Sequence, residues 1–420
     1  MKSQLKSGAI LSYISLMLNS VISIIYTPVM LDLLGQSQYG LFSLASAAVG
    51  FVSIINFGLG NAVIRYTAKI DKKDEEARSN LFGTFFIMYV ILGLIALIVG
   101  IILVLYSHIF FADTLSPSEF KTLKLLMVIL VMGTALGIGT GFFSVISLAY
   151  EKFIFQKLLT ILSAILNPIV MLPLLLLGYE SISMAIVTTS ISILNIFANM
   201  FYCFKILKVK IKFTKFQNGL FKEIITFSSF IFINMIIDKI YWSTDQILLG
   251  IYSGTVAISI YTVGATFTGY FSGFATAISN VFLSRVTVMA SLKNPMATLS
   301  NLFIKLGRIQ FIVLSFLMGG FIVYGREFLN LWVGEQYKDS FIVAVLILIP
   351  MILSLIQSIG GVILQAMNIL KFKTYLYLVI ALLNLILSTF LVQKWGAIGC
   401  AAATGIAFTI GNIIIMNLYY

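Results

Sequence analysis

The chain has 420 residues, of which 60% are hydrophobic and 10% are charged, and its formal net charge is +12. A soluble domain is about half apolar and about 25% charged, so this composition excludes a soluble protein and indicates an integral membrane protein. The positive charge does not indicate nucleic-acid binding, because the apolar runs leave no stretch long enough for an extramembrane domain.

Twelve apolar runs predict an all-α, polytopic membrane protein, because a helix needs about 20 apolar residues to cross a bilayer. The runs are continuous, whereas the strands of a membrane barrel would alternate. Met1–Gly8 is basic and the next run reaches Leu31 without a cleavage site, which predicts a first span and no cleavable signal peptide. The predicted spans are 9–31, 40–64, 81–106, 122–149, 154–177, 182–204, 224–250, 255–283, 302–325, 341–366, 374–392 and 397–418.

Lysine and arginine set the predicted orientation, since they concentrate in cytoplasmic loops. With the N-terminus in the cytoplasm, 21 of the 27 lie on the cytoplasmic side, five lie outside, and Lys239 lies within a span. An extra or missing span would invert every later loop, so both termini are predicted to be cytoplasmic.

Weak similarity at a constant offset predicts two six-helix lobes. Ala149 precedes Asn167 by 18 residues, and Ala366 precedes Asn384 by 18, an offset of 217 between the pairs. An even number of helices makes the repeats parallel, related by an axis along the membrane normal. The predicted lobes are 1–204 and 224–420; chance similarity between apolar helices is the alternative.

The predicted linker, 205–223, alternates lysine with apolar residues in its first part (KILKVKIKFTKFQNGLFKE). This pattern is typical of a basic segment on the anionic inner leaflet, where each lysine contributes about 1 kcal/mol. An ordinary positive-inside loop explains it equally well.

The seventh span carries ionisable groups that lipid does not favour. Asn234, Asp238, Trp242 (or Tyr241) and Asp245 share one helical face, and Asp238 lies about 21 Å from the cytoplasmic end. A charge at this depth normally faces a protein interior or a watery cavity. We interpret Asn234, Asp238 and Asp245 as candidates for a cavity lining that binds a coupling proton or cation. Structural pairing of Asp238 and of Lys239 with partners on other helices, and an interfacial position for Asp245, are the alternatives.

Arg65 and Arg285 end the second and eighth spans on the cytoplasmic side. The planar guanidinium group can donate two hydrogen bonds to one phosphate. With Asn61 and Lys239, these residues are candidates for binding an anionic headgroup; simple anchoring at the membrane surface is the alternative for the arginines.

The sequence gives little support for a metal site, nucleotide binding or enzymatic activity. Cys203, Cys400 and the single histidine, His108, show no metal-ligand spacing, and no phosphate-binding loop motif is present. We expect no metal, cofactor, nucleotide or nucleic-acid partner, and a protein that is not an enzyme. A gradient, the membrane potential, or use of the product outside the cell is the expected source of energy.

Three segments resemble bacterial polysaccharide flippases of the Wzx type, which act on O-antigen repeat units. LLGQSQYGLFSLASAAVGFVSIINFGLGNAVIRYTAK resembles their first two helices, TDQILLGIYSGTVAISIYTVGA their helix 7–8 turn, and GREFLNLWVGEQYKDS their outer loop between helices 9 and 10. The resemblance places the chain in the multidrug/oligosaccharidyl-lipid/polysaccharide (MOP) exporter superfamily and implies two MATE-like lobes around a central cavity. Relatives have a cationic cavity, whereas helix seven here also supplies two acids.

The resemblance implies a flippase that moves undecaprenyl-pyrophosphate-linked oligosaccharides across the bacterial cytoplasmic membrane by alternating access, for capsule, exopolysaccharide or O-antigen synthesis. Its implied partners are the lipid-linked substrate, membrane lipids, and polysaccharide polymerase and chain-length machinery. Two alternatives remain: a MATE-like, cation-coupled exporter of drugs or metabolites, and a membrane glycan polymerase or ligase. The last would require a large outer loop, which the sequence lacks.

Overall fold

The computed structural model describes residues 2–71, 74–213, 218–290, 295–367 and 371–419, and every regular element within them is a helix. This confirms the predicted all-α fold. The elements are α1 (Lys2–Val52), η1 (Ser53–Asn56), α2 (Leu59–Lys69), α3 (Glu75–Phe111), α4 (Pro117–Ala149), α5 (Phe153–Leu176), α6 (Ser181–Phe201), η2 (Tyr202–Ile206), α7 (Asn218–Tyr252), α8 (Gly254–Ala290), α9 (Pro295–Val333), η3 (Glu335–Tyr337), α10 (Asp339–Ile356), α11 (Ser358–Ala366), α12 (Lys371–Phe408), η4 (Thr409–Ile415) and α13 (Met416–Tyr419).

Nine helices of the described residues are long and apolar enough to cross a membrane, and two of them have double length: Leu11–Lys69 and Phe372–Ile415. Each of these two contains a glycine with a non-helical, positive φ, Gly35 at 71° and Gly396 at 51°. Glycine adopts such angles without a steric cost, so each marks a turn between two spans. Together with the 37 residues of α8, the described helices provide the twelve predicted spans.

The chain divides into two compact units, Met1–Lys239 and Ile240–Tyr420, and the boundary lies inside α7. The first half of α7 belongs to the first unit because it packs there: Ile224 is part of a buried core cluster, and the Arg65 guanidinium lies 4.5 Å from the centre of the Phe227 ring. The units therefore differ from the predicted lobes, which placed this half-helix in the second.

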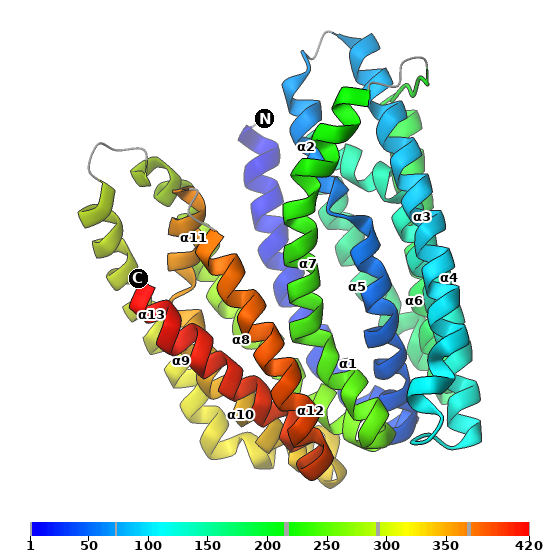
Figure 1. Cartoon of the computed structure of the whole chain (residues 1–420), viewed down its shortest axis with the longest axis vertical. Helices are drawn as coiled ribbons and strands as arrows, with labels where there is room; N and C mark the ends of the chain where they lie inside the picture. The colour runs from blue at the N-terminus through cyan, green and yellow to red at the C-terminus, as the bar shows by residue number, and fades with distance from the viewer. Residues whose placement is uncertain (1, 72–73, 214–217, 291–294, 368–370, 420) are drawn as a thin grey trace. The chain divides into compact units, whose positions relative to one another are not determined.

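In the first unit, α3 and α4 run side by side (Figure 1). Glycines allow this close approach: a Cβ at Gly93 would lie 2.6 Å from Gly139 Cα, and one at Gly133 would lie 3.0 Å from the Thr189 side chain on α6. Lipid tails are as apolar as leucine, so helices associate in membranes by such close packing. The glycine-rich run of α4 thus holds α3 and α6.

A capping box of Ser116 and Glu119 fixes the start of α4. Ser116 accepts a hydrogen bond from the Glu119 backbone N–H (3.3 Å), and the Glu119 carboxylate accepts one from the Ser116 backbone N–H (3.0 Å). This reciprocal capping satisfies two N–H groups that the first helical turn leaves open, and Pro117 fits the first helical position.

Between η2 and α7, the described part of the predicted linker includes a segment without regular secondary structure, residues 207–213. Two of its apolar side chains turn inward: Val209 is buried, and Ile211 packs against the same core cluster, whereas Phe213 is exposed. Lys208, Lys210 and Lys212 are exposed. The alternation thus gives the segment one face for the protein core and one for the surroundings.

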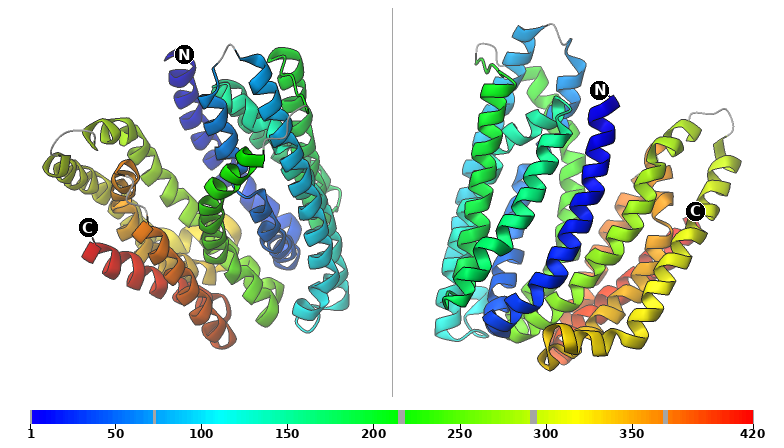
Figure 2. Two further views of the ribbon diagram at one scale, coloured as in Figure 1. Left: turned by 45° about the horizontal axis from the view of Figure 1, so that its top comes forward. Right: turned by 180° about the vertical axis from the view of Figure 1, so that it is seen from behind.

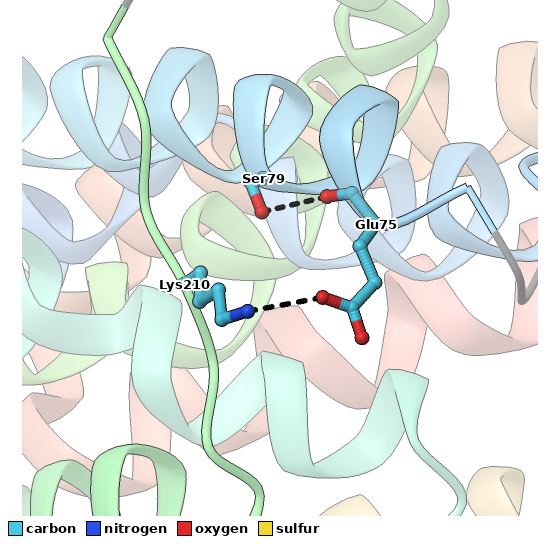
Figure 3. Close-up of polar contacts among 3 residues, drawn as sticks. All are labelled: Glu75, Ser79 and Lys210. Carbon is cyan, nitrogen blue, oxygen red and sulfur yellow. Dashed lines mark hydrogen bonds and ion pairs between the residues drawn. The ribbon is translucent and has the colours of Figure 1, made fainter.

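Two contacts join this segment to the start of α3, and Figure 3 shows the one between Lys210 and Glu75. The Lys212 backbone N–H donates to Ser79 O (3.1 Å), and Lys210 Nζ lies 3.1 Å from Glu75 Oε2. The ion-paired side chains are 69% and 67% exposed, so we expect the pair to contribute less than about 1 kcal/mol. The backbone contact and the buried apolar residues therefore hold the segment.

Replacing Gly83 with alanine is expected to displace this segment, because a Cβ there would overlap the Lys212 carbonyl oxygen. Limited trypsin digestion measures the change, since Lys208, Lys210 and Lys212 become better substrates. Lys210→Ala is the control: it removes the ion pair, and the rate of cleavage at the two remaining lysines should stay within about twofold of wild type. Equal cleavage in Gly83→Ala and wild type would contradict this account.

In the second unit, α10 packs against α8, α9 and α12. Glycines again lie at the close approaches. A Cβ at Gly264 on α8 would lie 2.7 Å from Ser340 O on α10, and one at Gly405 on α12 would lie 2.5 Å from Leu346 O.

Candidate functional site

Asp245 on α7 lies in the interior of the second unit, with 1% of its surface exposed. Its carboxylate accepts three hydroxyl hydrogen bonds. Tyr261 Oη on α8 (2.6 Å) and Thr404 Oγ1 on α12 (2.7 Å) donate to Oδ2, and Ser388 Oγ on α12 (2.7 Å) donates to Oδ1. Three helices thus contribute to one buried acidic centre, which we call the Asp245 centre.

Asn384 determines that the Thr404 hydroxyl donates its hydrogen bond to Asp245. Its Nδ2 donates to Thr404 Oγ1 (2.8 Å), so the threonine proton is left to point at Asp245. Its Oδ1 lies 3.3 Å from Ser388 Oγ. Asn384 and Ser388 are four residues apart on one helical face, and both are fully buried.

The turn at Gly396 brings the two halves of α12 to the same carboxylate. Ser388 lies eight residues before this glycine and Thr404 eight residues after it. Small residues (GAIGCAAATG, 396–405) let the halves approach closely; a Cβ at Gly399 would overlap the Leu391 carbonyl. The local sequence therefore explains why two distant hydroxyls converge.

Within the part of the chain that the structure describes, the Asp245 centre has no compensating positive charge. Among the residues that the structure describes, no lysine or arginine pairs with it; Cys400 Sγ lies 4.0 Å from the Asp245 carbonyl oxygen. An ionised carboxylate buried in a membrane is costly even with three donors, and a bound proton or cation removes that cost. No group of three or more His, Cys, Asp or Glu residues that could hold a metal occurs in the described part of the chain. The centre is therefore suited to a proton or a singly charged cation.

The other polar residues of α7 have different surroundings. Asn234, Asp238 and Trp242 are exposed, whereas Asp245 is buried. The predicted polar stripe thus does not face one environment, because α8 and α12 cover its far end. The interfacial alternative for Asp245 does not fit its burial.

Lys239 lies against α1 in the first unit: its Nζ is 3.1 Å from where a Cβ at Gly50 would be. Asn61 and Arg65, one turn apart on α2, are exposed. Arg65 stacks on Phe227, twelve residues before Lys239 on α7, which is about 18 Å along the axis. Arg65 and Lys239 therefore do not form one anion site, and the Arg285 side chain lies outside the described residues.

Comparison with known proteins places the chain in a family. Residues 5–283 match the family described as polysaccharide biosynthesis protein. The chain belongs to the polysaccharide biosynthesis protein family.

Individual relatives agree with this membership. The chain is 22% identical over 397 residues to a Shigella flexneri protein assigned as an O-antigen transporter, covering 92% of this chain and 90% of that protein. A solved structure of the lipid II flippase MurJ, inward closed, has a TM-score of 0.73 at 18% identity, covering 98% of this chain and 87% of that one. An inward-facing MATE family transporter of the MOP superfamily has a TM-score of 0.71 at 13% identity, covering 95% and 92%. The predicted family and MATE-like fold are confirmed.

The sequence alone identified Asp245 as a candidate site residue, but it did not identify the residues that hydrogen-bond to its carboxylate. Asn384 served only as a marker of the repeat, and Tyr261, Ser388 and Thr404 were not singled out. One feature of the sequence does point to these residues: Asn384 and Ser388 are polar, lie four positions apart in an apolar helix, and therefore share one helical face. It does not reveal which acid these groups meet.

Proposed function

We propose that this protein is a flippase that moves an undecaprenyl-pyrophosphate-linked oligosaccharide from the inner to the outer leaflet of the bacterial cytoplasmic membrane. The observation that carries the proposal is membership of the polysaccharide biosynthesis protein family over residues 5–283. The MurJ-like fold supports a flippase role, and the relatives are transporters and not enzymes. The product would serve the synthesis of capsule, exopolysaccharide or O-antigen.

The physical task explains why a protein is needed. A pyrophosphate bearing polar sugars cannot cross about 30 Å of hydrocarbon unaided. The prenyl tail can stay in lipid while a hydrophilic path in the protein shelters the head, and alternating access would then move the head outward. Arg65, Lys239, Arg285 and Asn61 remain candidates for contacts with the pyrophosphate, and Arg65 and Lys239 would meet it at different points along α7.

The Asp245 centre supports gradient-driven coupling. A carboxylate that binds a proton or a singly charged cation changes the charge of the second unit, and that change can favour one conformation over another. Its three donors come from α8 and both halves of α12, so neutralisation alters hydrogen bonds to several helices at once. We expect loading of this centre to drive the return step.

Reconstituted vesicles test the flippase proposal. Purified protein is inserted into liposomes that contain lipid-linked oligosaccharide extracted from the host, and an added lectin reports glycan in the outer leaflet. With the protein, glycan from both leaflets should become accessible; protein-free vesicles expose the outer leaflet alone. Equal exposure in both preparations would overturn the proposal. Efflux of a cationic dye in place of glycan exposure would favour a multidrug exporter.

A further inference from the structure

A second polar site lies within the first unit, between α1, α5 and α6. It is a pocket of about 500 Å³, and the described residues that line it include three asparagines, four hydroxyl side chains and no charged residue. Pockets of about 300–1,000 Å³ are typical of small-molecule sites. We call it the α1–α5 pocket.

Two helices turn matching polar faces toward this pocket. On α1 and on α5 the polar residues recur every three or four positions, which places them on one helical face. The helices lie side by side (Figure 2, right). The polar residues are Asn19, Ser23 and Tyr26 on α1, Thr160, Ser163 and Asn167 on α5, and Asn195 on α6.

Hydrogen bonds among neighbouring amides hold one side of the pocket in place. Asn195 Nδ2 donates to Ser163 Oγ (2.8 Å) and so joins α6 to α5. Gln156 Nε2 donates to Asn199 Oδ1 (2.6 Å), and Asn199 Nδ2 donates to the Asn195 carbonyl (2.8 Å). These residues shape the pocket and have few hydrogen bonds left for a ligand.

Other polar groups of the pocket have no protein partner among the described residues. The Tyr26 hydroxyl is buried and makes no hydrogen bond. The Asn167 side chain makes none with either its N–H or its C=O. Pro168 has no N–H, so the helical hydrogen bond to the Ala164 carbonyl is absent as well. The Tyr26 hydroxyl, the Asn167 amide and the Ala164 carbonyl are therefore unpaired groups at the wall of the pocket.

These groups lie deep in the membrane region, about 10–21 Å from the cytoplasmic end of α5 for Thr160 to Asn167. Buried polar groups without hydrogen bonds cost free energy, so such a hollow holds water or a polar ligand. Its polar groups can donate and accept, which matches a ligand that also does both.

The charge of the pocket narrows the class of ligand. A pyrophosphate would require lysine or arginine, and an organic cation would be matched by a carboxylate; the part of the lining that the structure describes contains neither. A bare divalent cation is bound mainly by carboxylates, with oxygens at about 2.3–2.6 Å, and the described lining has no carboxylate. Uncharged polyhydroxyl groups remain.

The sequence repeat supports a division of roles between the units. At the offset of 217, Asn167 corresponds to Asn384 of the Asp245 centre, while Ser388 and Thr404 correspond to the buried Met171 and Val187. At the second offset, 215, shown by the LLG segments at 33 and 248, Asp245 corresponds to Met30, also buried. The first unit therefore keeps the amide at this place without the acid and without the hydroxyls that correspond to Ser388 and Thr404.

We propose that the α1–α5 pocket binds uncharged sugar residues of the transported glycan, with Asn167, Tyr26 and the Ala164 carbonyl hydrogen-bonding to sugar hydroxyls. This inference rests on the proposed flippase function and specifies which part of the substrate this pocket binds. The pocket then selects for the glycan, separately from any contact with the pyrophosphate.

The double variant Tyr26→Phe/Asn167→Ala tests the pocket, because neither removed group makes a hydrogen bond within the protein and the fold should be kept. The probes are free oligosaccharide, released by mild acid from the lipid-linked precursor of the host, and undecaprenyl pyrophosphate without sugar. Calorimetry on purified protein should show oligosaccharide affinity reduced about 5- to 30-fold and undecaprenyl pyrophosphate affinity unchanged. Ser192→Ala, an exposed α6 position outside the pocket, is the control and should bind both probes as wild type.

Unchanged oligosaccharide affinity in the double variant would overturn the pocket proposal, as would an equal loss for both probes. A pocket that held a cation would instead show altered Na⁺ or K⁺ dependence with full oligosaccharide affinity. Glycan exposure by the wild-type protein in vesicles separates the two proposals: if the wild type flips the precursor and the double variant still binds oligosaccharide normally, the pocket assignment alone fails.

Discussion

Replacing Asp245 with asparagine is expected to reduce gradient-driven flipping about 5- to 150-fold, the range of a typical coupling between linked sites. Asparagine has the shape of aspartate, and its carbonyl oxygen can still accept from Tyr261 and Thr404, while its amide can donate to the Ser388 oxygen. The fold should therefore be kept and the ionisable group alone lost. Flipping is measured in lectin-accessible vesicles with an imposed pH or Na⁺ gradient, and again with no gradient.

Asp238→Asn is the matched control, because it removes an exposed acid from the same helix two turns earlier. Its effect on gradient dependence should be several-fold smaller than that of Asp245→Asn. Flipping without a gradient should be similar in both variants and in wild type. If Asp245→Asn retained the wild-type response to both gradients, the Asp245 centre would be structural and coupling would lie elsewhere.

The sequence was sufficient to predict the spans because bilayer thickness fixes their length. The gap between the predicted spans 9–31 and 40–64 contains Gly35, and the gap between 374–392 and 397–418 contains Gly396, the two residues that break the double-length helices. The division inside α7 was not predictable in this way. Hydropathy treats α7 as one apolar run, whereas its first half is held by contacts with Arg65 and a buried cluster.

The environment of Asp245 shows a second limit of sequence reasoning. Counting residues placed it about 32 Å along α7, near the outer interface. Depth along one helix does not determine its neighbours, and Tyr261, Ser388 and Thr404 reach it from positions 16 to 159 residues away. An acidic residue within a predicted span was enough to mark Asp245 as a candidate site residue. Its burial could not be predicted, because it depends on how α8 and α12 pack.

Replacing Gly93 with alanine is expected to destabilise the first unit by about 1–3 kcal/mol, the usual cost of forcing a methyl group into a packed contact. The new Cβ would lie 2.6 Å from Gly139 Cα and 3.1 Å from Ala135 O, both on α4. These neighbours are backbone atoms of a helix, so relief requires the whole of α4 to move. The midpoint of thermal aggregation in detergent, followed by size-exclusion chromatography, should fall by several degrees.

Gly137→Ala is the matched control for this prediction, since it lies on α4 and a Cβ there meets no atom within 4 Å. Alanine is a better helix former than glycine by about 1 kcal/mol, so this variant should melt at or above the wild-type temperature. The opposite signs of the two substitutions separate packing from helix propensity. If both variants unfolded at the same temperature, close backbone contact would not hold α3 against α4, and it would not account for the glycines of α4.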